Sequence, residues 1–203
     1  MAGPTEPLPA GERPSDRERS LYIGACRIDL VRRSGTGRLL SDARLAGTVA
    51  RALEAAGAPV PASVTVVLTD DTELRDLNRA HLERDEPTDV LSFPMLEPSA
   101  YPDHPGKASD AADPARPGAH AHREHDARER RHIGDIAISI ERAIEQAEQG
   151  RGGQTGDIRW SPADEIRLLV THGVLHLCGW DHAEPVEEAA MRALEQRLLA
   201  EAR

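Results

Sequence analysis

The chain has 203 residues, of which 39% are hydrophobic and 30% charged, and its formal net charge is −10 at pH 7. This length suits one domain with a sizeable core. No run of 18 apolar residues is present and the first residues lack the apolar segment of a secretory signal, so we expect neither a transmembrane helix nor secretion. The acidic balance argues against nucleic-acid binding through bulk electrostatics, although it does not exclude a local basic groove.

Cysteine content indicates the compartment. The chain contains only Cys26 and Cys178, which lie far apart and have no CxxC partner. A secreted disulfide framework is therefore disfavoured, and we expect a cytoplasmic protein in which both thiols are buried apolar groups.

Two stretches have compositions typical of disorder. Residues 1–20 contain four prolines, and residues from about 97 to 131 are rich in Pro, Ala, Asp, Arg and His. We expect a disordered tail over 1–20, then a single catalytic domain over 21–203 that carries a disordered insertion at about 97–131. A His-rich tract can gather zinc, but we expect a polar loop from the histidines of this region, which are His104, His120, His122, His125 and His132.

Hydrophobic periodicity and capping residues predict the elements of this domain. In chain order they are a strand at 21–31, a helix at 42–56, a strand at 63–69, a helix at 70–82, strands at 89–93 and 133–140, and helices at 141–149, 161–178 and 184–202. The strands at 89–93 and 133–140 are expected to pair as a hairpin whose loop is the insertion. Because strands and helices do not alternate regularly, the predicted fold is α+β, with a small mixed β-sheet flanked by helices.

The predicted helix at 161–178 carries the candidate site. His172 and His176 are four residues apart, so their imidazoles lie on one face of the helix. Gly179 is typical of a residue that ends a helix, and the reversed chain would bring back His182 as a third ligand. Since zinc commonly binds imidazole nitrogen, the sequence predicts one Zn²⁺ per chain at these histidines.

Three protein ligands leave a fourth coordination position open, which is the pattern of catalytic zinc. Such zinc lowers the pKa of a bound water to about 7, so the expected reaction class is metal-assisted hydrolysis. The histidine spacing also matches metzincin proteases, but these require Glu directly after the first histidine, where this chain has Gly173. Peptide cleavage is therefore disfavoured, and the missing side chain at Gly173 would leave room for a bulky substrate.

Four ordered motifs resemble those of the YbeY family, which are single-domain bacterial metal-dependent endoribonucleases. The segment THGVLHLCGWDH at 171–182 is similar to the family signature H-G-x-L-H-L-x-G-Y-D-H. The other motifs are DD at 70–71 with LN at 77–78, PTDVLSFP at 87–94 and GDIAIS at 134–139, accompanied by Met191 and Glu195 in the last helix. The resemblance covers about residue 63 to the end, without the insertion.

The resemblance implies a YbeY-like zinc-hydrolase fold in which His172, His176 and His182 bind the zinc. It implies a single-strand-specific endoribonuclease that acts in 16S rRNA 3′-end maturation and ribosome quality control in the bacterial cytoplasm. The implied partners are ribosomal RNA and pre-ribosomal particles, with ribosomal proteins or assembly GTPases as further candidates and no membrane. Two alternatives remain open, namely a ribosome-assembly binding factor with weak or no nuclease activity, and an unrelated zinc hydrolase.

The remaining candidates for catalysis are less well defined by the motifs. The family often has an arginine where this chain has Leu82, so Arg84, or alternatively Arg79, is a candidate for the missing cation. The alternative, that each is a solvated arginine of an exposed helix, stays open. Asp135 either lines the cleft as a catalytic group or accepts backbone hydrogen bonds. Asp181 either orients a ligand imidazole or caps the next helix.

Overall fold

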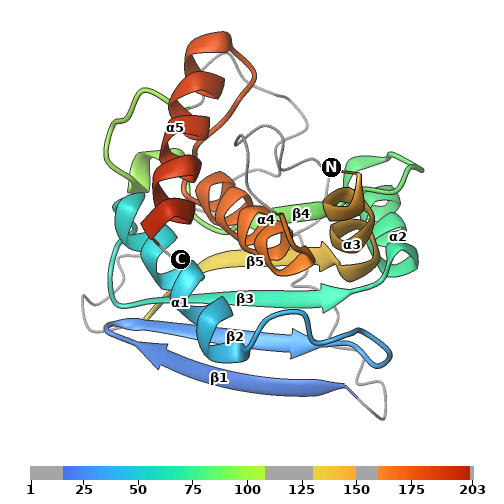
Figure 1. The fold of residues 1–203 in the computed structure, drawn as a ribbon. Coiled ribbons are helices and arrows are strands. Elements are labelled where there is room, and N and C mark those ends of the chain that lie inside the picture. The colour runs from blue at the N-terminus through green and yellow to red at the C-terminus, as the bar shows by residue number, and fades with distance from the viewer. Residues whose placement is uncertain (1–15, 108–129, 150–159, 202–203) are drawn as a thin grey trace.

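The centre of the computed structural model, which describes residues 16–107, 130–149 and 160–201, is a mixed sheet of order β1-β2-β3-β5-β4 (Figure 1). The strands are β1 (Arg17–Ile23), β2 (Cys26–Arg32), β3 (Ala62–Thr69), β4 (Val90–Pro94) and β5 (Arg131–Ser139). The three inner strands are parallel, and each edge strand is antiparallel to its neighbour. The predicted α+β class and the predicted pairing of β4 with β5 are both confirmed.

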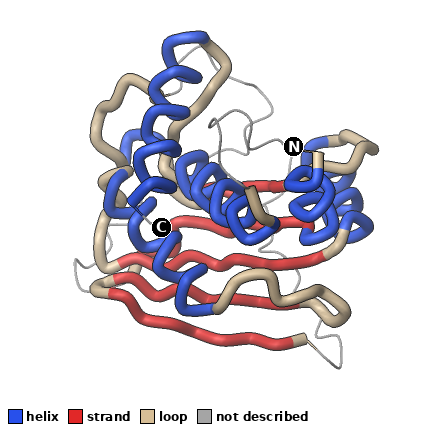
Figure 2. Tube along the Cα trace, viewed as in Figure 1, coloured by secondary structure: helices blue, strands red, loops and turns tan. Residues whose placement is uncertain are grey.

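Most of the helices lie together on one side of the sheet (Figure 2). The helices are α1 (Asp42–Ala55), α2 (Asp71–Leu82), α3 (Ile140–Glu148), α4 (Pro162–Leu177) and α5 (Pro185–Glu201), with a short 3-10 turn, η1, at Pro98–Ala100. Each predicted helix is present with bounds within one residue of the expected ones. Leu74 of α2 packs with Val67 and Ala137 on one face of the sheet, whereas α1 and α4 pack on the other.

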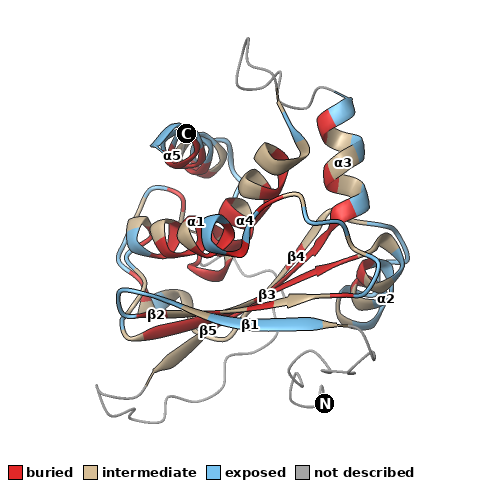
Figure 3. Ribbon diagram, turned by 60° about the horizontal axis from the view of Figure 1, so that its bottom comes forward, coloured by how far each residue is buried: buried red, intermediate tan, exposed pale blue. Residues whose placement is uncertain are grey.

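The core between α4 and the sheet determines which way the histidines point. The apolar stripe of α4 is buried as the sequence predicts, with Val170 and Val174 fully enclosed against a core that includes Ile136 and Ile138. Figure 3 shows this buried layer beneath the helices. Because the stripe occupies the sheet side of α4, the side chains of His172 and His176 lie on its other flank, where both are only partly buried.

The expected strand at 21–31 is wrong in one respect, because the chain reverses within it. Gly24 has a φ of 56°, and the turn at Gly24 and Ala25 separates β1 from β2. Since β1 begins at Arg17, the last four residues of the tail expected over 1–20 lie in a strand. Residues 1–15 lie outside the described residues. The exposed pattern of β1 explains why no apolar periodicity marked it.

The insertion is also shorter than expected at both ends. Tyr101 is 4% exposed, Lys107 forms an isolated β-bridge with Trp180, and Arg131 already belongs to β5. Residues 108–129, which include His120, His122 and His125, lie outside the described residues. Among the helices that the structure describes, none combines the length and apolar character needed to cross a membrane.

Candidate metal centre

The three predicted ligands lie together at the C-terminal end of α4. The Nε2 atoms of His172 and His176 are 3.0 Å apart, and the ring of His182 lies 5.4 Å from that of His172 and 5.0 Å from that of His176. One nitrogen from each of the three rings lies within 4.8 Å of the others. The structure therefore brings together all three histidines that the spacing singled out.

Hydrogen bonds orient two of the rings. The Nδ1 atom of His172 lies 2.8 Å from Oε1 of Glu195, and the Nδ1 atom of His176 lies 2.9 Å from the carbonyl oxygen of Trp180. A carbonyl and a carboxylate both accept, so each Nδ1 carries the proton and each Nε2 presents a lone pair. This is the arrangement in which outer partners fix a metal-binding tautomer.

The donor set fits a metal ion. Two unprotonated Nε2 atoms that face each other at 3.0 Å repel unless a cation lies between them. Ligands held at 2.0–2.1 Å in tetrahedral geometry are about 3.3 Å apart, close to the separation found here. Burial, followed by the neighbouring His172 and His182, lowers the pKa of His176 to about 3, so this imidazole is neutral at pH 7, as a metal ligand must be.

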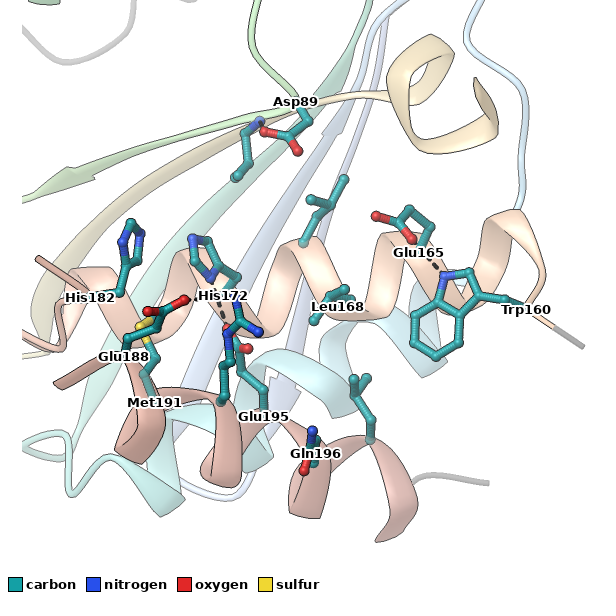
Figure 4. Close-up of a pocket in the computed structure, with 14 residues that line it drawn as sticks. Asp89, Trp160, Glu165, Leu168, His172, His182, Glu188, Met191, Glu195 and Gln196 are labelled. Atoms are coloured by element: carbon teal, nitrogen blue, oxygen red, sulfur yellow. Dashed lines mark hydrogen bonds and ion pairs between the residues drawn. The ribbon is translucent and has the colours of Figure 1, made fainter. Parts of the chain in front are cut away.

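A cavity of about 400 Å³ adjoins the histidines between α4 and α5. Figure 4 shows His172, His182, Glu188 and Glu195 around one end of it, and Trp160 with Glu165 at the other. Its lining is acidic, since it includes the carboxylates of Asp89, Glu165, Glu188 and Glu195. We would expect a positive rim beside an RNA-cleaving centre, but the rim of this cavity is mainly acidic.

Arg192 is the one arginine or lysine among the described residues that line this cavity. Its guanidinium lies 2.7 Å from Glu188, one turn earlier on α5. Arg192 was missed in the sequence because it belongs to no motif. Its spacing from Glu188 and Glu195 places all three along one side of α5, and this is the signal that would have found it.

The two arginines proposed from sequence lie elsewhere. Arg84 follows the last turn of α2 and is exposed, and Arg79 pairs with Asp76. Neither lines the cavity, and Leu82 is 40% exposed. The structure therefore does not bring Arg84 together with the histidines.

Asp135 lies on the opposite face of the sheet from the histidines. Its neighbour Ile136 faces Gly173 of α4, and successive side chains of a strand point to opposite faces. Asp135 is 5% exposed and lies 2.9 Å from the Nε2 atom of His132. The structure therefore places this predicted catalytic carboxylate behind the sheet, paired with a histidine whose side chain is 38% exposed.

Asp181 has a different role from both expected ones. Its Oδ1 accepts a hydrogen bond from the backbone N–H of His182, 2.8 Å away, and its own backbone N–H donates to the carbonyl of Gly106, 2.7 Å away. At the start of α5 it is Glu187 that accepts, from the N–H of Glu184. Asp181 therefore fixes the turn that carries His182.

Gly173 does not leave room for substrate. A Cβ atom at this position would lie 2.9 Å from Cγ2 of Ile136 and 3.2 Å from Oγ of Ser92. The Ser92 hydroxyl also donates to the Gly173 carbonyl at 3.2 Å. Glycine is needed here because α4 packs closely on the sheet. The expectation that its missing side chain leaves room for a bulky substrate is therefore wrong.

The segment 104–107 supports the metal centre and was not foreseen. His104 stacks on the ring of Trp180 with centroids 4.0 Å apart and planes 8° from parallel. Trp180 in turn supplies the carbonyl that orients His176, and it lies two residues before His182. We had expected disorder over these residues, whereas they hold the loop between two ligands.

Together the fold and the site define an α+β protein with a cluster of three histidines that could hold a metal ion, beside a cavity of about 400 Å³. The family model of Endoribonuclease YbeY matches residues 38–203. The chain therefore belongs to the YbeY family.

Two named relatives agree with this assignment, those of Salinispora tropica and Thermobifida fusca. Endoribonuclease YbeY of Salinispora tropica is 41% identical over 85% of this chain and 94% of its own. The Thermobifida fusca protein of the same name is 37% identical over 85% of this chain and 92% of its own. The solution structure of TM1509 from Thermotoga maritima aligns with 87% of this chain and 88% of that one, with a TM-score of 0.47 and 22% identity.

Proposed function

We propose that this chain is a zinc-dependent endoribonuclease that cleaves single-stranded RNA in the 3′-end maturation of 16S rRNA and in ribosome quality control. The observation that carries the proposal is the convergence of three imidazole nitrogens beside a cavity of about 400 Å³. The relatives that bear the name Endoribonuclease YbeY support the choice of RNA as substrate.

The residues of this chain divide the work of such a reaction. His172, His176 and His182 would hold the zinc, which supplies Lewis-acid chemistry and lowers the pKa of a bound water. Glu195 and the Trp180 carbonyl keep the first two rings in the ligating tautomer. Arg192 lies in the cavity wall, where a guanidinium can bind a phosphate oxygen and offset developing charge.

The proposed place of action is the bacterial cytoplasm. Cys26 and Cys178 are free and buried, as suits a reducing compartment. The proposed partners are ribosomal RNA and pre-ribosomal particles, with ribosomal proteins or assembly GTPases as candidates for recruitment. An acidic chain benefits from such protein contacts, because bulk attraction to RNA is weak.

The test compares His172→Ala with a matched control, His81→Ala. His81 lies on α2 and contacts Phe93, away from the metal centre. We expect His172→Ala to lose bound zinc and to stop cleaving a single-stranded 16S rRNA precursor, while His81→Ala keeps both. Full cleavage by the metal-free His172→Ala protein would refute the proposal. Specific RNA binding without cleavage by the unmodified protein would instead favour an assembly factor.

A further inference from the structure

A second cavity, of about 430 Å³, lies at the β1 edge of the sheet, near the start of α1. Its lining differs in charge from that of the cavity beside the histidines. Five arginines contribute to it, which are Arg17, Arg19, Arg32, Arg33 and Arg38. Among the described residues that line it, Asp42 is the one acid. We call it the five-arginine cavity.

Asp42 cannot neutralise the arginines around it. Its Oδ1 accepts from Nε and Nη2 of Arg32, each at 3.0 Å, and its Oδ2 lies 3.1 Å from Arg19 and 3.7 Å from Arg38. One carboxylate therefore serves three guanidinium groups. The side chains of Arg19 and Arg38 are 66% and 58% exposed, so donors that Asp42 leaves unused face solvent.

The other two arginines differ from each other. Arg33 is 7% exposed at its side chain and is bound by Glu73 and Asp16, so it acts as part of the frame. Arg17 has no carboxylate partner among the described residues, and it lies directly across the strand pair from Arg32. Like charges that face each other across strands destabilise the pair, and the Asp42 carboxylate compensates Arg32 but does not bind Arg17.

The wall between the arginines is small and polar. Ser34, Gly35 and Thr36 form it, and Gly35 has a φ of 85° in the turn that follows β2. No large side chain of this turn closes the cavity. Even with Asp16 and Glu73 included, five positive groups meet three carboxylates, so the region is positive on a chain whose net charge is −10.

We propose that the five-arginine cavity binds a backbone phosphate of the RNA and anchors the substrate away from the metal centre. This inference rests on the proposed function. Guanidinium forks bind phosphate oxygens in pairs, and of the described residues that line the cavity beside the histidines only Arg192 serves that purpose. Four of the five arginines precede residue 38, where the family match begins, so the anchor is a feature of this chain's N-terminal hairpin.

The position of the cavity suits an anchor. Asp42 begins α1, which packs with α4 on the same face of the sheet, while α4 covers β4 and β5 at the far edge. Three to four strand spacings of about 4.8 Å separate the two regions across the sheet, so they lie at least roughly 15–20 Å apart. A few nucleotides of single-stranded RNA can span this distance, so one strand can occupy both sites.

The first test is RNA binding by Arg19→Gln/Arg38→Gln against a matched control, Arg75→Gln/Arg79→Gln. The control removes two exposed arginines of α2, 52% and 60% exposed, which pair with Asp85 and Asp76 respectively. Full-length metal-free protein and a labelled single-stranded 16S precursor RNA are used, so that nothing is cleaved. Loss of this one phosphate contact should lower the salt slope by about 0.7 and weaken binding about fivefold at 0.1 M salt. The control should stay within twofold of the unmodified protein. Equal losses in both pairs, or no RNA binding by the unmodified protein, would overturn the anchor.

A second arm identifies the source of the phosphate. Tripolyphosphate should raise the melting temperature of the unmodified protein and of the control pair, but not that of the Arg19→Gln/Arg38→Gln pair. If tripolyphosphate binds there while RNA affinity is unchanged, the cavity takes a free phosphate compound and the RNA anchor is wrong. If the pair weakens RNA binding but the unmodified protein cleaves nothing, the anchor stands and the proposed nuclease function fails.

Discussion

The packing of Gly106 against Trp180 makes a sharp prediction about the metal centre. A Cβ atom on Gly106 would overlap Cε3 of the Trp180 ring and lie 2.8 Å from its Cζ3. The ring cannot easily retreat, because Trp180 is 7% exposed and His104 stacks against it. Gly106→Ala must therefore displace either Trp180 or its own segment. The Trp180 carbonyl orients His176, and the carbonyl of residue 106 accepts a hydrogen bond from the backbone N–H of Asp181.

The magnitude follows from these contacts. Overpacking of this kind costs about 1–3 kcal/mol, which lowers the melting temperature of a chain this size by roughly 2–4 °C per kcal/mol. Loss of the partner that orients a ligand imidazole typically lowers metal affinity about 10–100-fold. Both effects are expected together in Gly106→Ala.

The assay is competition for Zn²⁺ with a chromophoric chelator, supported by the visible spectrum of the Co²⁺-loaded protein. Gly47→Ala is the matched control, since its new Cβ would meet only Arg51 Nη1 at 3.4 Å within α1. That change should leave zinc affinity unaltered and stabilise the helix by up to about 1 kcal/mol. If Gly106→Ala bound zinc within twofold of Gly47→Ala, with the same Co²⁺ spectrum, the claim that segment 104–107 positions the ligands would be wrong.

Three further predictions concern the same region. Glu195→Gln should weaken zinc binding about 10–100-fold, because His172 loses its charged partner at Nδ1; unchanged affinity in the chelator assay would contradict this. Removing the metal with a chelator should lower the melting temperature and one equivalent of Zn²⁺ should restore it, since zinc binds the folded state; a melting temperature indifferent to metal would count against the site. Burial first, and then Lys107, lower the pKa of His104, so below pH 6.5 the unfolded chain takes up a proton there that the folded chain resists. The free energy of unfolding should therefore fall as pH drops through this range. Measured by urea unfolding at pH 7 and pH 5, it should fall less in His104→Asn than in the unmodified protein.

Much of the metal centre was predictable because its ligands are local in sequence. His172 and His176 are one helical turn apart, and a glycine reverses the chain before His182, so short-range geometry alone brings them together. Glu195 could be recognised as part of a motif, but its bond to His172 spans 23 residues and depends on how α5 packs. The role of Trp180 was hidden because it acts through a backbone carbonyl.

The errors also have physical causes. Asp135 belongs to a motif, yet strand alternation points it away from α4, and a bulge beside Gly134 lets it reach His132. The arginines of the five-arginine cavity are spread over residues 17–38, partly in a stretch whose composition suggested disorder. Only the antiparallel pairing of β1 with β2 gathers them.

The most direct test of the central claim is zinc add-back to the metal-free protein. RNA cleavage should be absent without metal, rise with added Zn²⁺ and level off at about one zinc per chain, while His172→Ala stays inactive throughout. Cleavage at the full rate before any metal is added, or an equal response in His172→Ala, would contradict a catalytic three-histidine zinc site.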